Sequence, residues 1–188
     1  MSRLKEVYFK KIQPELKKTL GIENSYALPR LEKVVLNIGI GQAKGNPKFE
    51  ENAQETLSAI TGQRPAPRKA KKAISGFKIR QGEKIGLMVT LRGDKMYDFI
   101  DRLINITLPR MRDFRGIDVK NFDNKGNLTL GISEQIIFPE ITHEKAEIIH
   151  GLSITIVTTA KNTDEAKALM KELGFPIKGE IVIKKEGK

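Results

Sequence analysis

The sequence contains no cysteine among its 188 residues. Disulfide bonds, thiolate nucleophiles and sulfur-ligated metals are therefore excluded, and we expect a reducing, cytoplasmic environment. The sequence also lacks any apolar run near the roughly 20 residues that a bilayer-crossing helix needs. Its first twenty residues carry eight charged side chains, which a secretory signal peptide would not tolerate. We therefore expect a soluble protein that does not bind a membrane.

Signatures of catalysis are missing as well. The chain has no Gly-x-Ser-x-Gly motif, and its two histidines have no cysteine with which to form a nucleophilic pair. His143, Glu147 and His150 would lie near one face of a helix, but no second histidine stands four residues after His143. A strand pattern then begins directly after Gly151. We expect no catalytic residue, no metal and no cofactor.

The glycine-rich stretch over 39–45 lies between a strand pattern and a helix pattern, as nucleotide-binding loops do. A dinucleotide fingerprint starting at Gly39 would require glycine at position 44, which is Lys44. A phosphate-binding loop would require Gly-Lys followed by Ser or Thr, whereas the order here is Lys44-Gly45-Asn46. Tight turning explains the glycines better, and a nucleotide-binding enzyme is kept as the rival hypothesis.

Positive charge is concentrated in one short segment. Residues 64–84 contain eight Lys or Arg and one acid, Glu83, which is +7 out of a formal net charge of +11 for the whole chain. A compact basic block on an otherwise nearly neutral chain indicates a polyanion-binding site, and nucleic acid is the polyanion that we expect. Large apolar residues are rare there, so we predict a flexible basic loop over about 68–85.

The tip of this predicted loop places two apolar side chains between cations. Two interpretations of residues 75–82 are open. In one, Lys78 and Arg80 grip phosphates while Phe77 packs on a sugar or a base. In the other, the segment is a solvated hairpin whose Phe77 folds back onto the body of the protein.

Hydrophobic periodicity predicts interleaved strands and helices. Strands are expected over 31–40, 87–91, 127–132 and 152–159, and helices at the N-terminus, after Asn46-Pro47, after Gly93-Asp94 and after Thr163. Pro14 should break or kink the first helix. The strands are short and amphipathic, so we predict an α+β two-layer sandwich: an antiparallel sheet with helices on one face and a long basic protruding loop. The length favours a single domain over 1–188.

One face of the sheet should stay open. Alternation puts the apolar side chains on the covered face: Val34, Leu36, Ile38, Leu87, Val89, Leu91, Leu128, Leu130, Ile154 and Ile156. The same alternation puts Lys33, Asn37, Thr90 and Arg92 on the open face. An open face is ordinarily just solvated, but amide, hydroxyl and guanidinium groups beside a basic loop can dock a folded RNA. Aromatic residues for stacking bases are missing from this face, which favours structured RNA over single strands.

Several motifs in fixed order carry a family resemblance. They are LPRLEK at 28–33, NIGIG at 37–41, TGQRP at 61–65, ISGFKIR at 74–80, VTLRG at 89–93, LINITLPR at 103–110, DFRG at 113–116, QIIFPE at 135–140 and IVTTAK at 156–161. With these motifs the chain resembles the bacterial large-subunit ribosomal protein L five family over nearly its whole length. The resemblance implies a non-enzymatic structural constituent of the large ribosomal subunit. It also implies binding to 5S rRNA, which the protein would help to anchor in the central protuberance.

The resemblance further implies particular contacts. The 5S-binding residues of the family map onto Asn37, Gln63 and Thr90, with Lys33, Arg64 and Arg92 as neighbours. The loop formed by Ser75, Gly76, Phe77, Lys78, Ile79, Arg80, Gln81 and Gly82 is expected to contact P-site tRNA. Another surface would bridge to small-subunit ribosomal protein S thirteen, and the acid-bearing stretch 134–147 is suggested for it by charge alone. We further expect 23S rRNA as a partner and a monomer when free, with a free regulatory RNA-binding module as the alternative.

Overall fold

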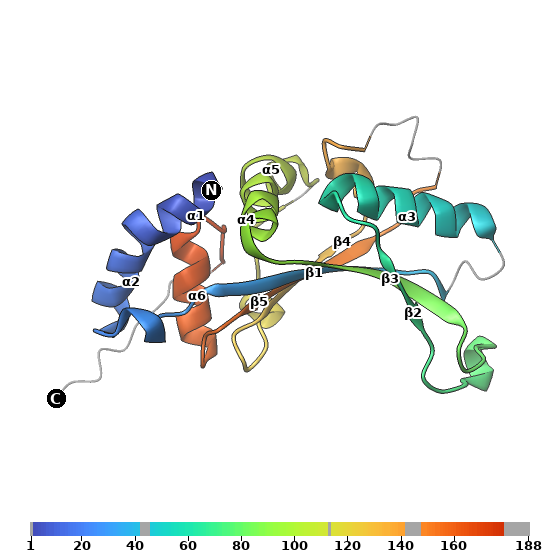
Figure 1. Cartoon of the computed structure of the whole chain (residues 1–188), viewed down its shortest axis with the longest axis horizontal. Helices are drawn as coiled ribbons and strands as arrows, with labels where there is room; N and C mark the ends of the chain where they lie inside the picture. The colour runs from blue at the N-terminus through green and yellow to red at the C-terminus, as the bar shows by residue number, and fades with distance from the viewer. Residues whose placement is uncertain (1, 42–45, 113, 142–147, 179–188) are drawn as a thin grey trace. The chain divides into compact units, whose positions relative to one another are not determined.

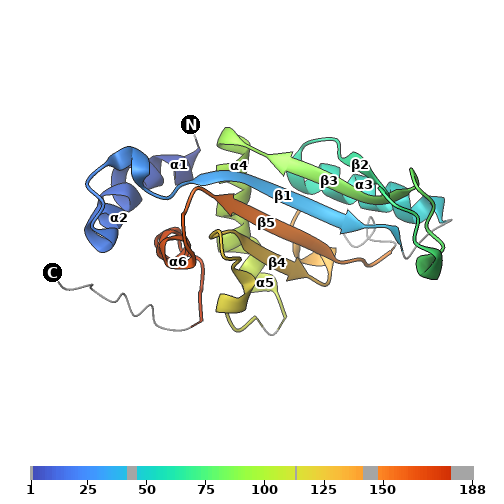
Figure 2. The ribbon, with the colours of Figure 1, turned by 90° about the horizontal axis from the view of Figure 1, so that it is seen from below.

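The computed structural model describes residues 2–41, 46–112, 114–141 and 148–178. Within these residues, five strands form one sheet in the order β2-β3-β1-β5-β4 (Figure 2). The strands are β1 (Leu31–Gly39), β2 (Ala66–Lys69), β3 (Lys84–Leu91), β4 (Leu128–Ile132) and β5 (Leu152–Thr158). The sheet is antiparallel and open, with helices packed on it, which confirms the predicted α+β class.

α-Helices occur at all four expected positions (Figure 1). The α-helices are α1 (Arg3–Val7), α2 (Gln13–Leu20), α3 (Pro47–Thr61), α4 (Gly93–Arg102), α5 (Leu108–Arg110) and α6 (Thr163–Glu172), and the short α5 was not predicted. Two π-helical stretches, Tyr8–Ile12 and Leu103–Thr107, follow α1 and α4 directly. Short 3-10 helices occupy Ser25–Ala27, Ser75–Phe77, Val119–Asn121 and Gln135–Ile137. No helix of the described part of the chain is long and apolar enough to cross a bilayer.

Contacts divide the chain into two compact units. Unit 1 comprises Met1–Val34, Arg92–Leu130 and Thr155–Lys188, and unit 2 comprises Val35–Leu91 and Gly131–Ile154. Strands β1, β4 and β5 each contribute residues to both units. The single domain over 1–188 stays a prediction.

The predicted core is confirmed in both units. All ten apolar side chains assigned to the covered face of the sheet are buried, none more than 5% exposed. In unit 2, α3 packs on β3, and in unit 1, α1 packs on α4 and α2 packs on α6. The period-two alternation of apolar residues along the strands therefore correctly predicts which side chains are buried.

Prolines at two places are accommodated by widened helical turns. Pro14 lies at the start of α2, and the π-helical stretch Tyr8–Ile12 comes directly before α2. Pro109 stands in the same relation to the stretch Leu103–Thr107. A proline ring clashes with the carbonyl four residues earlier in a regular α-helix, and a π-helical turn moves that carbonyl out of register. The expected break at Pro14 is thus a change of helix type, and the chain remains helical.

Among the described strands, β2 is the one that periodicity did not predict. It pairs antiparallel with β3 at the edge of the sheet, with Ala66 opposite Met88 and Arg68 opposite Gly86. All four of its residues are exposed, so no apolar alternation marks it. Pro67 is tolerated because an edge strand has one side without ladder hydrogen bonds. The basic segment 68–85 is therefore the connection of a β2–β3 hairpin, while its flexibility stays a prediction.

Candidate nucleic-acid interface

The open face of unit 2 carries an exposed amide close to a glycine of the neighbouring strand. Asn37 is exposed on β1, and Gly86 lies on the neighbouring strand β3. A Cβ atom at Gly86 would lie 3.6 Å from Asn37 Oδ1 and 3.2 Å from the Ile38 carbonyl oxygen. Gly86 is itself buried, so the missing side chain leaves room for the Asn37 amide beside it on this face.

Within the described residues, the Asn37 side chain takes part in no hydrogen bond, although its backbone carbonyl accepts one from Ser153 Oγ at 3.4 Å. Its donor and its acceptor are therefore both available to a ligand. Thr90 follows Gly86 on the same face of β3 by the alternation of the strand, and it is half-buried. Its hydroxyl likewise has no hydrogen-bond partner among the described residues, so both predicted face residues offer polar groups to a ligand.

Arg68 adds a cation to this face that the sequence patterns missed. It stands opposite Gly86 in the β2–β3 register, and its Cβ lies 4.0 Å from where a Cβ at Gly86 would be. Its Nη2 donates to Met88 Sδ at 3.4 Å. The guanidinium therefore lies along the open face of β3, where a phosphate could meet it.

A shallow groove extends the open face of unit 2 on the side of Asn37 away from β3. It is lined by Asn37, Gly39, Gly131, Ile132, Ser133, Gly151, Leu152 and Ser153. Glycines on neighbouring strands leave the backbone accessible, and two serines supply hydroxyl groups. Such a surface allows close approach of a sugar–phosphate backbone. Ser133 and Ser153 are further candidate contacts, and strand parity alone would have placed Ser153 on this face.

Gln63 and Arg64 are placed by the end of α3. Gly62 ends the helix with φ +64, and the Gln63 backbone N–H donates to Thr61 Oγ1 at 3.3 Å. Gln63 is half-buried and Arg64 exposed. In the described part of the chain no hydrogen bond joins the Gln63 side chain to Asn37 or Thr90. The structure thus gives Gln63 and Arg64 a defined position between α3 and β2 without joining them to the other face residues.

Lys33 and Arg92 are brought together in unit 1 by one carboxylate. Glu32 Oε1 lies 3.5 Å from Lys33 Nζ and 4.0 Å from Arg92 Nη1. The Arg92 side chain is 62% exposed, and that of Lys33 is 31% exposed. The two cations exceed the one acid, so this edge of unit 1 remains positive.

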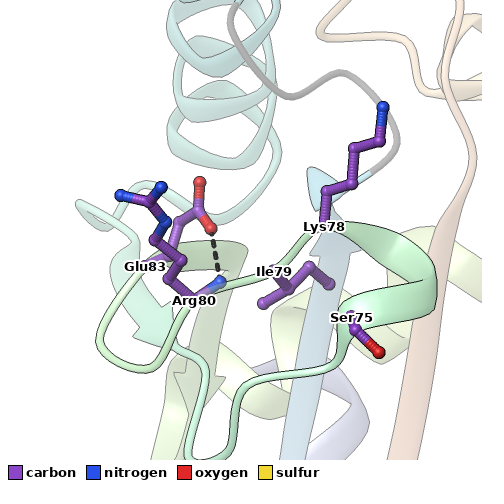
Figure 3. A pocket seen from close by; sticks show the side chains of 5 residues that line it. All are labelled: Ser75, Lys78, Ile79, Arg80 and Glu83. Carbon is purple, nitrogen blue, oxygen red and sulfur yellow. Dashed lines mark hydrogen bonds between the residues drawn. The ribbon is translucent and has the colours of Figure 1, made fainter.

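The basic loop is built as a two-step extension of the β2–β3 hairpin. Ala70 and Glu83 first continue the pairing, with the Ala70 N–H donating to the Glu83 carbonyl at 2.8 Å. An isolated bridge between Ile74 and Ile79 then closes the tip, with N···O distances of 2.9 and 3.1 Å. The backbone N–H of Arg80 donates to Glu83 Oε2 at 2.9 Å (Figure 3). The single acid of the basic block therefore helps to shape the loop.

The loop tip presents cations around an exposed ring. Ser75, Lys78, Ile79, Arg80 and Glu83 line a hollow, and Lys78 and Arg80 extend away from each other on either side of Ile79 (Figure 3). Lys78 has φ +53, a left-handed conformation that turns the chain sharply after the 3-10 helix. Phe77 is 74% exposed. Phe77 does not fold back onto the protein, so the solvated-hairpin interpretation with a docked Phe77 is wrong.

Lys84, a cation of the basic block, has an acidic partner on α3. Lys84 Nζ lies 2.7 Å from Glu50 Oε1 on α3, and the two side chains are 51% and 34% exposed. This pair links the root of the hairpin to the helix that covers it. The formal +7 of residues 64–84 therefore overstates the charge available to a ligand.

The residues considered for a metal or a nucleotide give no support to either ligand. His143 and Glu147 lie outside the described residues, as do residues 42–45 of the glycine-rich stretch. Within the described part, no group of three His, Cys, Asp or Glu residues could hold a metal ion. His150 is buried, with its ring centroid 5.6 Å from that of Phe49, and its backbone N–H donates to Gln135 Oε1. His150 is thus a core residue of unit 2.

Comparison with known proteins identifies the family. The family model for ribosomal protein L5 matches residues 24–80, and the model for the C-terminus of the same ribosomal family matches residues 84–177. Large ribosomal subunit protein uL5 of Anaeromyxobacter sp. (strain Fw109-5) is 55% identical over 177 residues, which are 94% of this chain and 98% of the relative. The uL5 proteins of Geobacter sulfurreducens and Syntrophotalea carbinolica are 53% and 57% identical, over 95% and 93% of this chain and 99% and 95% of those relatives.

These matches span both units and carry the name of a ribosomal structural protein, so an enzymatic role is set aside. The predicted location in the ribosome is confirmed in the same way. The chain belongs to the ribosomal protein L5 family, the uL5 proteins of the large ribosomal subunit.

Proposed function

We propose that this protein binds 5S rRNA through its open sheet face and helps to anchor that RNA in the central protuberance. The observation that carries the proposal is the pair of available polar groups of Asn37 and Thr90, which no described residue satisfies. Gln63 is the third proposed 5S-binding residue. Lys33, Arg64 and Arg92 would supply neighbouring phosphate contacts.

The chemistry of this face suits a folded RNA. Asn37 offers a donor and an acceptor, and Thr90 offers a hydroxyl, so both can meet a 2′-hydroxyl or the edge of a base. Short side chains on a sheet lose little conformational freedom when they bind, and the exposed glycines of the neighbouring groove, Gly39, Gly131 and Gly151, let the RNA approach closely. The face therefore recognises a shape, while the cations around it supply attraction that is the same for every RNA.

The basic loop would serve a second RNA. In this proposal Lys78 and Arg80 grip phosphates of P-site tRNA and the exposed Phe77 ring packs on a nucleotide, within the contact loop of residues 75–82. A further surface would bridge to small-subunit protein S thirteen, and residues 142–147 of the acidic stretch suggested for it lie outside the described residues. Contact with 23S rRNA, and a monomeric state when free, complete the proposal.

Filter binding at several salt concentrations tests the 5S assignment. The full chain is titrated with 5S rRNA and with a control transcript of equal duplex content whose loops are replaced by simple tetraloops. We expect tight binding only to 5S rRNA, with a log-log salt slope of about −0.9 for each duplex phosphate contacted. Equal affinity for both transcripts at moderate salt would show that the face reads no particular RNA.

A further inference from the structure

A hollow in unit 1 gathers the aromatic residues that the open sheet face lacks. It lies among the π-helical stretch Tyr8–Ile12, the 3-10 helix Ser25–Ala27, the start of β1 and the start of α4. All three tyrosines of the chain line it, together with one of the eight phenylalanines: Tyr8, Phe9, Tyr26 and Tyr97. Such a concentration is unusual in a chain with only 6% aromatic residues.

Two buried rings form the floor of this hollow. Tyr8 and Tyr97 are 3% and 6% exposed, and their ring centroids lie 6.4 Å apart. The Tyr8 hydroxyl donates to the Pro29 carbonyl at 2.9 Å, so this phenol is already satisfied. Phe9 stands edge-on to Tyr8, with centroids 5.3 Å apart, and is 49% exposed. The floor and one wall are therefore apolar ring surface that remains partly open.

Tyr26 stands at the rim with its ring almost wholly in water. It is 94% exposed, although its backbone N–H is held by Asn24 Oδ1 at 2.9 Å. The fold therefore fixes the backbone position of Tyr26 but buries little of its ring. A large aromatic side chain in such a position is suited to contact a ligand at low cost in conformational entropy.

The rim of the hollow is positively charged. Burial raises the pKa of Tyr8 to about 12 and raises that of Tyr97, and the positive charge of the exposed Arg30 opposes both shifts. Glu32 also lines the hollow, but its carboxylate lies 3.5 Å from Lys33 Nζ and 4.0 Å from Arg92 Nη1. Two neighbouring cations thus offset the charge of Glu32, and Arg30 adds a positive charge to the lining, which favours an anionic ligand.

We propose that this hollow binds one unpaired base of ribosomal RNA, with Tyr26 stacking on the base and Arg30 meeting the adjoining phosphate. Aromatic rings beside a guanidinium are the combination that binds extruded bases without regard to sequence. Lys33 and Arg92, already proposed as phosphate contacts, lie beside Glu32 of the hollow within unit 1. This stacking site rests on the proposed RNA-binding role and is separate from Asn37 and Thr90.

Variants at Tyr26 test the stacking site with little risk to the fold, because the side chain is so exposed. The full chain carrying Tyr26→Ala, Tyr26→Trp or the control Val119→Ala is titrated with 5S rRNA and, separately, with 23S rRNA. Val119 is another exposed apolar residue of unit 1. We expect Tyr26→Ala to weaken binding to one of the two RNAs roughly 5- to 150-fold, the value of one stacked base. Tyr26→Trp and Val119→Ala should bind as the unchanged chain does.

Two readouts identify the contact directly. The chain has no tryptophan, so Tyr26→Trp provides a single fluorophore that should be quenched when the base stacks on it. RNA carrying 4-thiouridine should cross-link to the tryptic peptide of residues 19–30. Unchanged affinity of Tyr26→Ala for both RNAs, or cross-links that avoid this peptide, would overturn the stacking site. Failure of 5S selectivity together with a cross-link of 23S rRNA to this peptide would instead sink only the 5S assignment.

Discussion

The open face of unit 2 and the tip of its basic loop present opposite kinds of chemistry. On the face, Asn37 and Thr90 are short polar side chains on paired strands, and Asn37 lies beside Gly86. At the tip, Lys78 lies within the small turn closed by the Ile74–Ile79 bridge, and Arg80 follows that bridge directly. Asn37 and Thr90 are neutral groups at fixed positions, whereas Lys78 and Arg80 carry charge on long side chains.

This difference separates attraction from selection. Phosphates are the same in every RNA, so cations raise affinity for all of them and make binding depend on salt. Neutral donors and acceptors at fixed positions are satisfied only by a ligand of matching shape, and an unmatched ligand leaves them desolvated and unpaired. A concentrated positive charge therefore marks where RNA is attracted, and the neutral polar groups of a rigid sheet determine which RNA is retained.

The largest expected effect comes from removing the polar groups of the face. Asn37→Ala combined with Thr90→Ala should weaken 5S binding about 5- to 150-fold, because two hydrogen bonds of roughly 0.5 to 1.5 kcal/mol each are lost. The salt slope should stay unchanged, since no cation is removed. Filter binding of 5S rRNA at several salt concentrations measures both quantities.

Lys78→Ala combined with Arg80→Ala provides the matched comparison for that experiment. This pair should change 5S affinity less than the face pair and should weaken P-site tRNA binding on assembled ribosomes. If the loop pair abolished 5S binding as strongly as the face pair did, the division between attraction and selection would be wrong. Circular dichroism on both double variants separates loss of contact from loss of fold.

Sequence patterns predict the sheet face well because the alternation of apolar and polar residues can be read within each strand separately. The strands β1, β3, β4 and β5 and all ten core side chains follow from period-two alternation, which any segment shows on its own. Asn37 and Thr90 are assigned to the open side by the same parity. The glycines that end α3 and follow α6 are also visible in the sequence, and both have positive φ.

What the sequence does not reveal depends on register between distant segments. Arg68 reaches the face because β2 pairs with β3, and nothing in four exposed residues indicates that pairing. The aromatic hollow likewise joins Tyr8, Tyr26 and Tyr97 from three elements of unit 1. No regular sequence spacing relates these three tyrosines, because each is positioned by a different secondary-structure element. Contacts of this kind are tertiary, and propensity carries no information about them.

Acid should lower the folding stability of the protein through one buried histidine, His150. Burial lowers the pKa of His150, and the backbone of Gly151 opposes the shift only in part. The unfolded chain therefore binds more protons than the folded one, so stability should fall as pH drops below about 6.5, by at most about 1.4 kcal/mol per pH unit. His150 packs against Phe49 on α3, the helix that leads to Gln63. We expect acid to weaken the packing of α3 in unit 2.

Thermal melts between pH 8 and pH 5 measure this dependence on the unchanged chain and on His150→Leu. The leucine variant should lose the part of the acid sensitivity that begins near pH 6.5, because it has no group to protonate. An identical decline in both proteins would place the sensitivity in other residues. Measuring the affinity for 5S rRNA over the same pH range then shows whether RNA binding and folding stability decline together.

The smallest expected effect concerns a cation that belongs to the basic block but is used inside the protein. Lys84 Nζ lies 2.7 Å from Glu50 Oε1, so its charge is largely compensated before any RNA arrives. Lys84→Ala should cost less than about 1 kcal/mol of stability, as partly exposed ion pairs do, and should leave the salt slope of RNA binding nearly unchanged. Lys78→Ala, measured beside it on assembled ribosomes carrying P-site tRNA, should reduce the slope by up to about 0.9. Equal changes in slope for the two variants would mean that the basic block attracts RNA by its total charge, and that position within the hairpin does not matter.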